Sequence, residues 1–181
     1  PIITEESYKN NFTNEGGIEG TTRFLKNITG MWLLEQCRKE WEKAGRKYTY
    51  PEIVEMAEQA VPFVRFVDPD DPRFANPSCM TKAIAGYCEE TGQPVPVTDA
   101  DFVRCIFESL ALRYNEVIRM LEGMAPFPIE RLHVIGGGSK NNLLNQFTAN
   151  AIGMPVIAGP SEATAIGNAM VQARSAGIVS T

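Results

Sequence analysis

Three consecutive glycines, Gly136, Gly137 and Gly138, form the stretch of this 181-residue sequence with the clearest chemical potential. They follow a short apolar run at 132–135 and precede an amphipathic helical segment, so we predict a turn at the carboxyl end of a β-strand. In an α/β sheet such a turn faces the ligand crevice, and glycines let backbone N–H groups approach an anion or a purine ring. The sequence matches neither the P-loop nor the dinucleotide fingerprint, so two interpretations stay open: a nucleotide site, or a tight turn with close helix packing.

A second strand, turn and helix follow directly. The apolar run "PVIAG" precedes the helical segment "TAIGNAMVQARSAG", and small residues around the start of this segment leave one helix surface nearly bare: Ala163, Ala165, Gly167 and Ala169. Two such units in a row predict parallel strands with helices packed against them. The bare surface fits either plain packing on the sheet or close contact with a second lobe across a cleft.

The part of the chain before these units predicts mostly helices. Apolar residues at helical spacing, with Pro51 in a first turn and Thr98 as an N-cap, predict four of them, over 23–45, 48–61, 78–92 and 98–123. A glycine-rich loop is expected over 13–22, and a short extended segment ending in an ordered loop over 63–78. The order of elements, helices first and then βαβα, indicates an α/β domain.

Composition and charge exclude several classes of function. Hydrophobic residues make up 44% of the chain and charged residues 22%, and the formal net charge is −5, with lysine and arginine scattered along the chain. No basic stripe therefore offers a site for nucleic acid, and no apolar run reaches the ~20 residues that a membrane helix needs. We expect a cytoplasmic globular domain that contacts neither nucleic acid nor membrane.

The cysteines and acidic residues predict neither a metal site nor a catalytic centre. The four cysteines form no C-x-x-C pair and the single His133 cannot complete a zinc set, so we expect reduced thiols, with Cys88 and Cys105 the one pair that could be bridged. Five aspartates fall in a proline-rich loop or at the start of the long helix, where we expect structural roles: Asp68, Asp70, Asp71, Asp99 and Asp101.

Two long blocks of the sequence resemble a known family. The block "VIGGGSKNNLLNQFTANAIGMPVIAGPSEATAIGNAM" resembles the C-terminal signature of the FGGY carbohydrate kinases, and "NEGGIEGTTRFLKNITGMWLLEQC" resembles their rhamnulokinase and L-fuculokinase branch. The similarity extends from about Asn11 to the end of the chain. It implies an α/β fold, namely a ribonuclease-H-like (actin-like ATPase) lobe with a mixed sheet, truncated N-terminal strands and many helices. Residues 1–181 would be the C-terminal, nucleotide-binding lobe, with the N-terminal lobe absent.

The resemblance also implies a reaction and a set of site residues. The parent enzyme would transfer the γ-phosphoryl group of ATP to the 1-hydroxyl of L-rhamnulose or L-fuculose. Gly137 and Asn141 would contact the nucleotide, and Gly136 and Gly138 would shape the turn. Two further nucleotide-binding positions come from the first predicted helix: Asn27, which would line the ATP and sugar cleft, and Glu35, where relatives carry a glutamine.

The resemblance also implies which functional residues lie outside this chain. The catalytic base, the carboxylates for Mg²⁺ and most sugar contacts would lie in the N-terminal lobe, so we expect no catalytic and no metal residue here, and an inactive fragment. The expected partners are ATP or ADP, a deoxyketose, that lobe, and a second copy in a homodimer. The alternative is a non-catalytic nucleotide-binding module of the same superfamily. A dinucleotide-binding oxidoreductase is disfavoured, because Glu162 would begin a helix instead of ending a strand.

Overall fold

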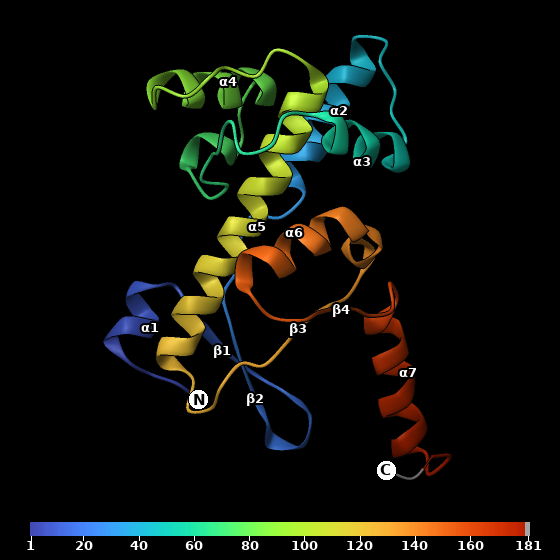
Figure 1. The fold of residues 1–181 in the computed structure, drawn as a ribbon. Helices are drawn as coiled ribbons and strands as arrows, with labels where there is room; N and C mark the ends of the chain where they lie inside the picture. The colour runs from blue at the N-terminus through green and yellow to red at the C-terminus, as the bar shows by residue number, and fades with distance from the viewer. Residues whose placement is uncertain (180–181) are drawn as a thin grey trace.

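One long helix, α5 (Asp99–Met124), runs through the molecule in the computed structural model, which describes residues 1–179 (Figure 1). It begins at the predicted N-cap, Thr98, which forms a capping box: the Asp101 N–H donates to Thr98 Oγ1 at 3.2 Å, and the Asp101 carboxylate accepts from the Thr98 N–H at 2.9 Å. The first half of α5 is almost completely buried, and its second half passes beside the short α1 (Glu5–Lys9) (Figure 1). The helix therefore joins a helical region to a region that contains the strands.

Three further helices surround the first half of α5: α2 (Trp32–Lys43), α3 (Tyr50–Gln59) and α4 (Met80–Glu90). Their apolar faces meet α5 in the hydrophobic core, where Trp41, Phe74 and Phe107 are the largest side chains with almost no exposed surface. Helix α3 begins as predicted, with Thr49 in a capping box and Pro51 in its first turn. The predicted helices over 48–61 and 78–92 are therefore confirmed, each with slightly shorter bounds.

The first predicted helix is wrong over its N-terminal part. Two antiparallel strands and a loop precede α2: β1 (Thr13–Gly16) and β2 (Thr22–Leu25). The predicted glycine-rich loop is thus the first strand and the turn of a hairpin. Phe24 and Leu25 fitted a helical spacing, but Phe24 instead stacks on Phe12, with 4.9 Å between the ring centroids. Cross-strand pairing supplies the backbone hydrogen bonds and apolar contacts that a helix would have supplied.

The C-terminal part has the predicted βαβα order. Its elements are β3 (Leu132–Val134), α6 (Asn142–Ile152), β4 (Val156–Ala158) and α7 (Ala163–Ser175). Strands β3 and β4 are parallel, with Leu132 opposite Val156, and α6 packs against α5 (Figure 1). The α/β prediction is confirmed, although the strands of the described residues form two separate pairs and not one mixed sheet. Helix α7 buries none of its residues, and its Arg174 forms an ion pair with Glu19 in the turn of the hairpin.

The remaining segments fit the expectations only in part. The stretch over 63–78 is irregular with one 3-10 turn, Pro72–Phe74, and contains no strand. All four cysteines are free, so Cys88 and Cys105 are not bridged. A hydrogen bond from the Cys105 thiol lowers the pKa of Cys88, and the same bond raises the pKa of Cys105. Among the described residues, no helix combines the length and apolarity that crossing a membrane requires.

Candidate nucleotide-binding site

The glycine turn connects β3 to α6 and is closed by several hydrogen bonds. Gly136 has a φ of +81°, a backbone conformation that only glycine adopts readily, and its N–H donates to the Pro160 carbonyl at 3.2 Å. The buried Ser139 closes the turn, because its N–H and its hydroxyl both donate to the Gly136 carbonyl, at 3.1 and 2.8 Å. Gly136 therefore shapes the turn and also connects the two βα units.

The positive φ that explains Gly136 does not explain the glycines at positions 137 and 138. Neither has a positive φ, both are exposed, and a Cβ added at either one would meet no atom within 4 Å. Neither the backbone conformation nor the packing of the described residues therefore requires glycine here. Open space in front of a glycine backbone is what the approach of an external group needs, which favours the nucleotide interpretation over close helix packing.

Asn141 occupies the N-cap of α6. Its Oδ1 accepts from the Leu144 N–H at 3.0 Å, and the Asn145 side chain donates to the Ser139 carbonyl at 2.9 Å. The Asn141 amide nitrogen has no partner among the described residues and remains a donor for a ligand. The turn therefore presents free backbone, one amide donor and the positive end of the α6 dipole at the same place.

Asn27 does not lie on a helix, contrary to the prediction. It belongs to the loop over 26–31, between β2 and α2, and its exposed side chain makes no hydrogen bond to the residues that the structure describes. The loop backbone is fixed, since the Thr29 N–H donates to Asp70 Oδ1 at 2.7 Å. At the start of α2, the Trp32 indole N–H donates to the Phe74 carbonyl at 3.1 Å.

Glu35 lies on α2, as expected, and its carboxylate is already engaged. Arg38, one turn later, contacts it at 3.0 Å, and the Tyr50 hydroxyl donates to it at 2.9 Å. The Arg38 guanidinium also lies over the Tyr50 ring, 4.4 Å from its centroid. The bond to Glu35 raises the pKa of Tyr50. Because Arg38 balances the charge of Glu35, this carboxylate repels a nearby phosphate less than a bare one would.

The six candidate residues thus fall into two groups. Gly136, Gly137, Gly138 and Asn141 share one turn, whereas Asn27 and Glu35 belong to the loop and helix that follow β2. No hydrogen bond or ion pair of the described residues joins the two groups. Arg38 and Tyr50, which hold Glu35, were not singled out from the sequence. The spacing of three residues between Glu35 and Arg38 was a signal for the first of them.

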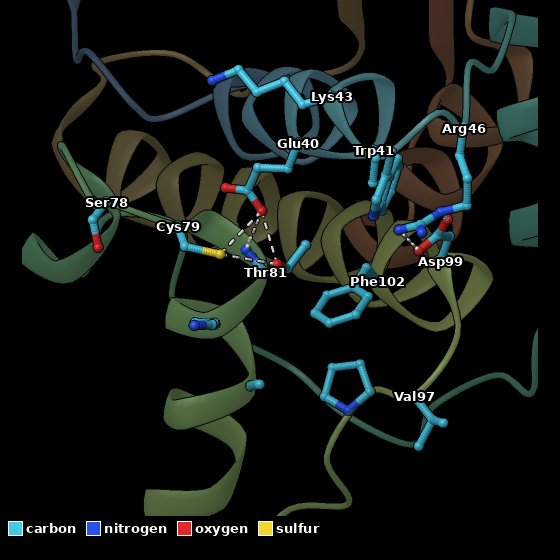
Figure 2. Close-up of a pocket in the computed structure, with 14 residues that line it drawn as sticks. Glu40, Trp41, Lys43, Arg46, Ser78, Cys79, Thr81, Val97, Asp99 and Phe102 are labelled. Carbon is cyan, nitrogen blue, oxygen red and sulfur yellow. Dashed lines mark hydrogen bonds and ion pairs between the residues drawn. The ribbon is translucent and has the colours of Figure 1, made fainter.

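A separate hollow of about 620 Å³ lies where α2, α4 and the start of α5 meet, and its polar groups serve the fold (Figure 2). The Glu40 carboxylate accepts from the Met80 N–H, from the Thr81 hydroxyl at 2.8 Å and from the Cys79 thiol at 3.4 Å, so it caps α4. Burial acts to raise the pKa of Glu40, but the bonds from Met80 and Thr81 outweigh it and lower the pKa.

The predicted aspartates also have structural partners. Asp99, on the other side of this hollow, pairs with Arg46 at 2.7 Å (Figure 2), and Asp71 accepts from the Arg73 N–H at 2.9 Å. Asp101 belongs to the capping box of α5. The expectation that these carboxylates serve the fold is confirmed for all three. The described residues contain no group of three or more histidine, cysteine, aspartate or glutamate side chains placed to hold a metal ion.

The chain is an α/β lobe with an open glycine turn at a strand end, and comparison with known proteins specifies its family. The chain belongs to the FGGY family of carbohydrate kinases, whose C-terminal domain matches residues 1–176. It is 60% identical over 177 residues to a rhamnulokinase of Bacteroides thetaiotaomicron, a match that covers 98% of this chain and 36% of that protein.

Two relatives of lower sequence identity are also rhamnulokinases. A rhamnulokinase of Bacillus subtilis is 43% identical over 172 residues, covering 95% of this chain and 35% of that protein. A rhamnulokinase of Pectobacterium carotovorum is 43% identical over 179 residues, covering 99% of this chain and 35% of that protein. The chain thus spans about a third of the length of the curated relatives that it matches.

Proposed function

We propose that these residues are the C-terminal, nucleotide-binding lobe of an ATP-dependent ketose kinase. The parent reaction is transfer of the ATP γ-phosphoryl group to the 1-hydroxyl of L-rhamnulose, with L-fuculose as the alternative substrate. Family membership supports a sugar kinase, and the name of the relatives favours L-rhamnulose. The observation that carries the assignment of the nucleotide to this lobe is the open space in front of Gly137 and Gly138.

In this proposal the lobe binds ATP and leaves the chemistry to the rest of the protein. The backbone at Gly137 lies against the base end of the nucleotide, the Asn141 amide donates to it, and Asn27 and Glu35 contact it from the other side. Bound Mg²⁺ would neutralise charge on the phosphates during transfer. We place the catalytic base, the Mg²⁺ ligands and most sugar contacts in an N-terminal lobe, because Asp71, Asp99 and Asp101 are engaged in caps and ion pairs.

The proposal includes the setting of the enzyme. We expect a cytoplasmic protein whose N-terminal lobe belongs to the same polypeptide and covers part of the surface that is exposed here. The apolar side chains of α7 support this, since Ile166 and Met170 are at least half exposed, at 50% and 55%. The same surface is the place where two copies of the isolated lobe would pair.

Steady-state kinetics of the full-length protein test the assignment. We expect L-rhamnulose-dependent ADP release, and a rise in the KM for ATP of at least about tenfold in Gly137→Val, because the new side chain occupies the space of the ligand. Gly16→Val is the matched control: Gly16 also has open space and no positive φ, but lies on β1. An unchanged KM in Gly137→Val would remove the nucleotide from this turn.

Two further outcomes separate the alternatives. A full-length protein that binds ATP but phosphorylates neither ketose would be the non-catalytic module of the same superfamily. The 181-residue chain by itself is expected to release no ADP with sugar present, and release above a no-enzyme control would contradict our placement of the catalytic base.

A further inference from the structure

The loop that carries Asn27 is held by a side chain distant in the sequence. Asp70 Oδ1 accepts the Thr29 N–H at 2.7 Å, across a separation of 41 residues. The Trp32 indole N–H donates to the Phe74 carbonyl at 3.1 Å, so both ends of this short stretch rest on the same proline-rich segment. These two contacts hold residues 29–32, which follow Asn27 closely in the chain, against that segment.

The Asp70 carboxylate is itself held by an arginine of helix α5. Arg113, on α5, contacts Asp70 Oδ2 through its Nε at 2.9 Å and through a terminal nitrogen at 2.8 Å. Only 13% of the Arg113 side chain is exposed, so solvent screens this pair weakly. The Asp70 N–H donates to Asp68 Oδ1 at 3.0 Å, which orients the carboxylate further. Burial acts to raise the pKa of Asp70, but the bonds from Thr29 and Arg113 outweigh it, lower the pKa and keep the group charged.

Asn27 is held only through its neighbours in the chain: on one side Lys26 donates to the Asn10 carbonyl at 2.5 Å, and on the other side Asp70 holds Thr29. Its side chain is exposed and makes no hydrogen bond within the described residues, so the backbone of the loop alone decides where it points. Thr29, two positions later, is the loop residue that Asp70 holds. A charge-assisted bond to a backbone N–H is among the stronger anchors that a loop can have.

We infer that Asp70, held by Arg113, is a positioning residue for ATP: it fixes the Thr29 backbone and thereby places Asn27 against the nucleotide. The inference rests on the proposed function. Asp70 touches no reacting atom and acts only through the loop. Its loss should therefore weaken ATP binding while leaving the sugar site and the chemical step nearly unchanged.

The test measures KM for ATP, KM for L-rhamnulose and kcat in the full-length kinase carrying Asp70→Ala. We expect KM for ATP to rise about tenfold, with KM for the sugar and kcat within about twofold of the parent. Asp70→Asn keeps an acceptor for the Thr29 N–H and should recover most of the affinity for ATP. If Asp70→Ala proves too unstable to assay, the double variant Asp70→Asn with Arg113→Gln takes its place. A KM for ATP equal to that of the parent, in Asp70→Ala or in this double variant, would overturn the inference.

Asp101→Ala is the matched control. Asp101 also accepts a backbone N–H and pairs with an arginine, Arg65, at 2.8 Å, but it lies at the start of α5. We expect Asp101→Ala to lower the melting temperature without changing KM for ATP. An equal rise of KM in Asp101→Ala and Asp70→Ala would mean that general loss of stability explains both, and would overturn the inference.

Asn27→Ala separates this inference from the proposed function. If Asn27→Ala raises KM for ATP and Asp70→Ala does not, only the positioning role is wrong. If neither substitution changes KM for ATP, the assignment of Asn27 to the nucleotide is wrong as well, and the positioning role falls with it.

Discussion

The helical region and the C-terminal βαβα region of this lobe differ in how completely they bury their own apolar surface. Helices α2 to α5 enclose a continuous core in which Trp41 and Phe107 are at most 2% exposed. In the βαβα region Ile135 is 58% exposed, α7 buries nothing, and two glycines of the turn face open space. The helical region thus has a continuous core of its own, whereas we propose that the βαβα region presents the surfaces at which a ligand and another part of the protein bind.

Removing one large side chain from each region should show the greatest contrast. Phe107→Ala leaves a cavity in the core and is expected to lower the free energy of unfolding by about 3–5 kcal/mol. Met170→Ala, on α7, removes a side chain that is 55% exposed and should change it by less than about 0.5 kcal/mol. Urea unfolding of the 181-residue chain measures both. Equal losses would mean that α7 is packed as firmly as the core.

Buried and exposed ion pairs should likewise differ in how much they stabilise the fold. The pH dependence of the free energy of unfolding measures this difference. Burial acts to raise the pKa of Asp101, but hydrogen bonds from the Thr98 N–H and from Arg65 outweigh it and lower the pKa to about 2. A lowered pKa means that the stabilisation is complete above the ordinary aspartate pKa and is lost as the pH falls through the folded value. Asp101→Asn should therefore cost roughly 2 kcal/mol at pH 7 and almost nothing near pH 1 to 2.

The control for this prediction is an exposed pair on the hairpin. Glu15 and Arg23 lie 2.6 Å apart, but half or more of each side chain is exposed, at 50% and 67%. Glu15→Gln should change the free energy of unfolding by less than about 0.5 kcal/mol at either pH. Parallel pH profiles for Asp101→Asn and the parent chain would contradict the role given to Asp101.

The smallest expected effect concerns the carboxylate of Glu35 on α2. Glu35→Gln weakens the hydrogen bond that is the main cause of the raised pKa of Tyr50 and also removes the carboxylate charge, so the pKa of this phenol should fall toward its ordinary value. An alkaline titration of tyrosine absorbance, compared with Tyr50→Phe, isolates this group. ATP affinity should change by less than about threefold, since Arg38 already balances the carboxylate. A Tyr50 pKa that does not move would show that Glu35 does not hold this hydroxyl in solution.

Local patterns predicted much of the fold, and long-range contacts account for what they missed. The capping box of Thr98 and Asp101 and the order of the βαβα region depend on residues close in sequence, so they could be derived from the sequence. The stretch from Phe24 to Ile28 fitted a helical spacing equally well, and only pairing with β1 makes its first part a strand. Asn27 was consequently placed on the wrong element.

The candidate site was predictable to the same extent. The glycine turn follows directly from its sequence, and the structure adds the reason that separates Gly136, which needs a positive φ, from Gly137, which does not. The support of Asn27 was not predictable. It depends on a contact between Thr29 and Asp70 across 41 residues, which no local pattern announces.

The central claim, that the glycine turn binds the nucleotide, is tested most directly by calorimetric titration of the 181-residue chain with ATP and with ADP. We predict saturable binding by the parent chain and by Gly16→Val, and at least about tenfold weaker binding by Gly137→Val at an unchanged melting temperature. Binding by Gly137→Val as tight as that of the parent chain would contradict the account.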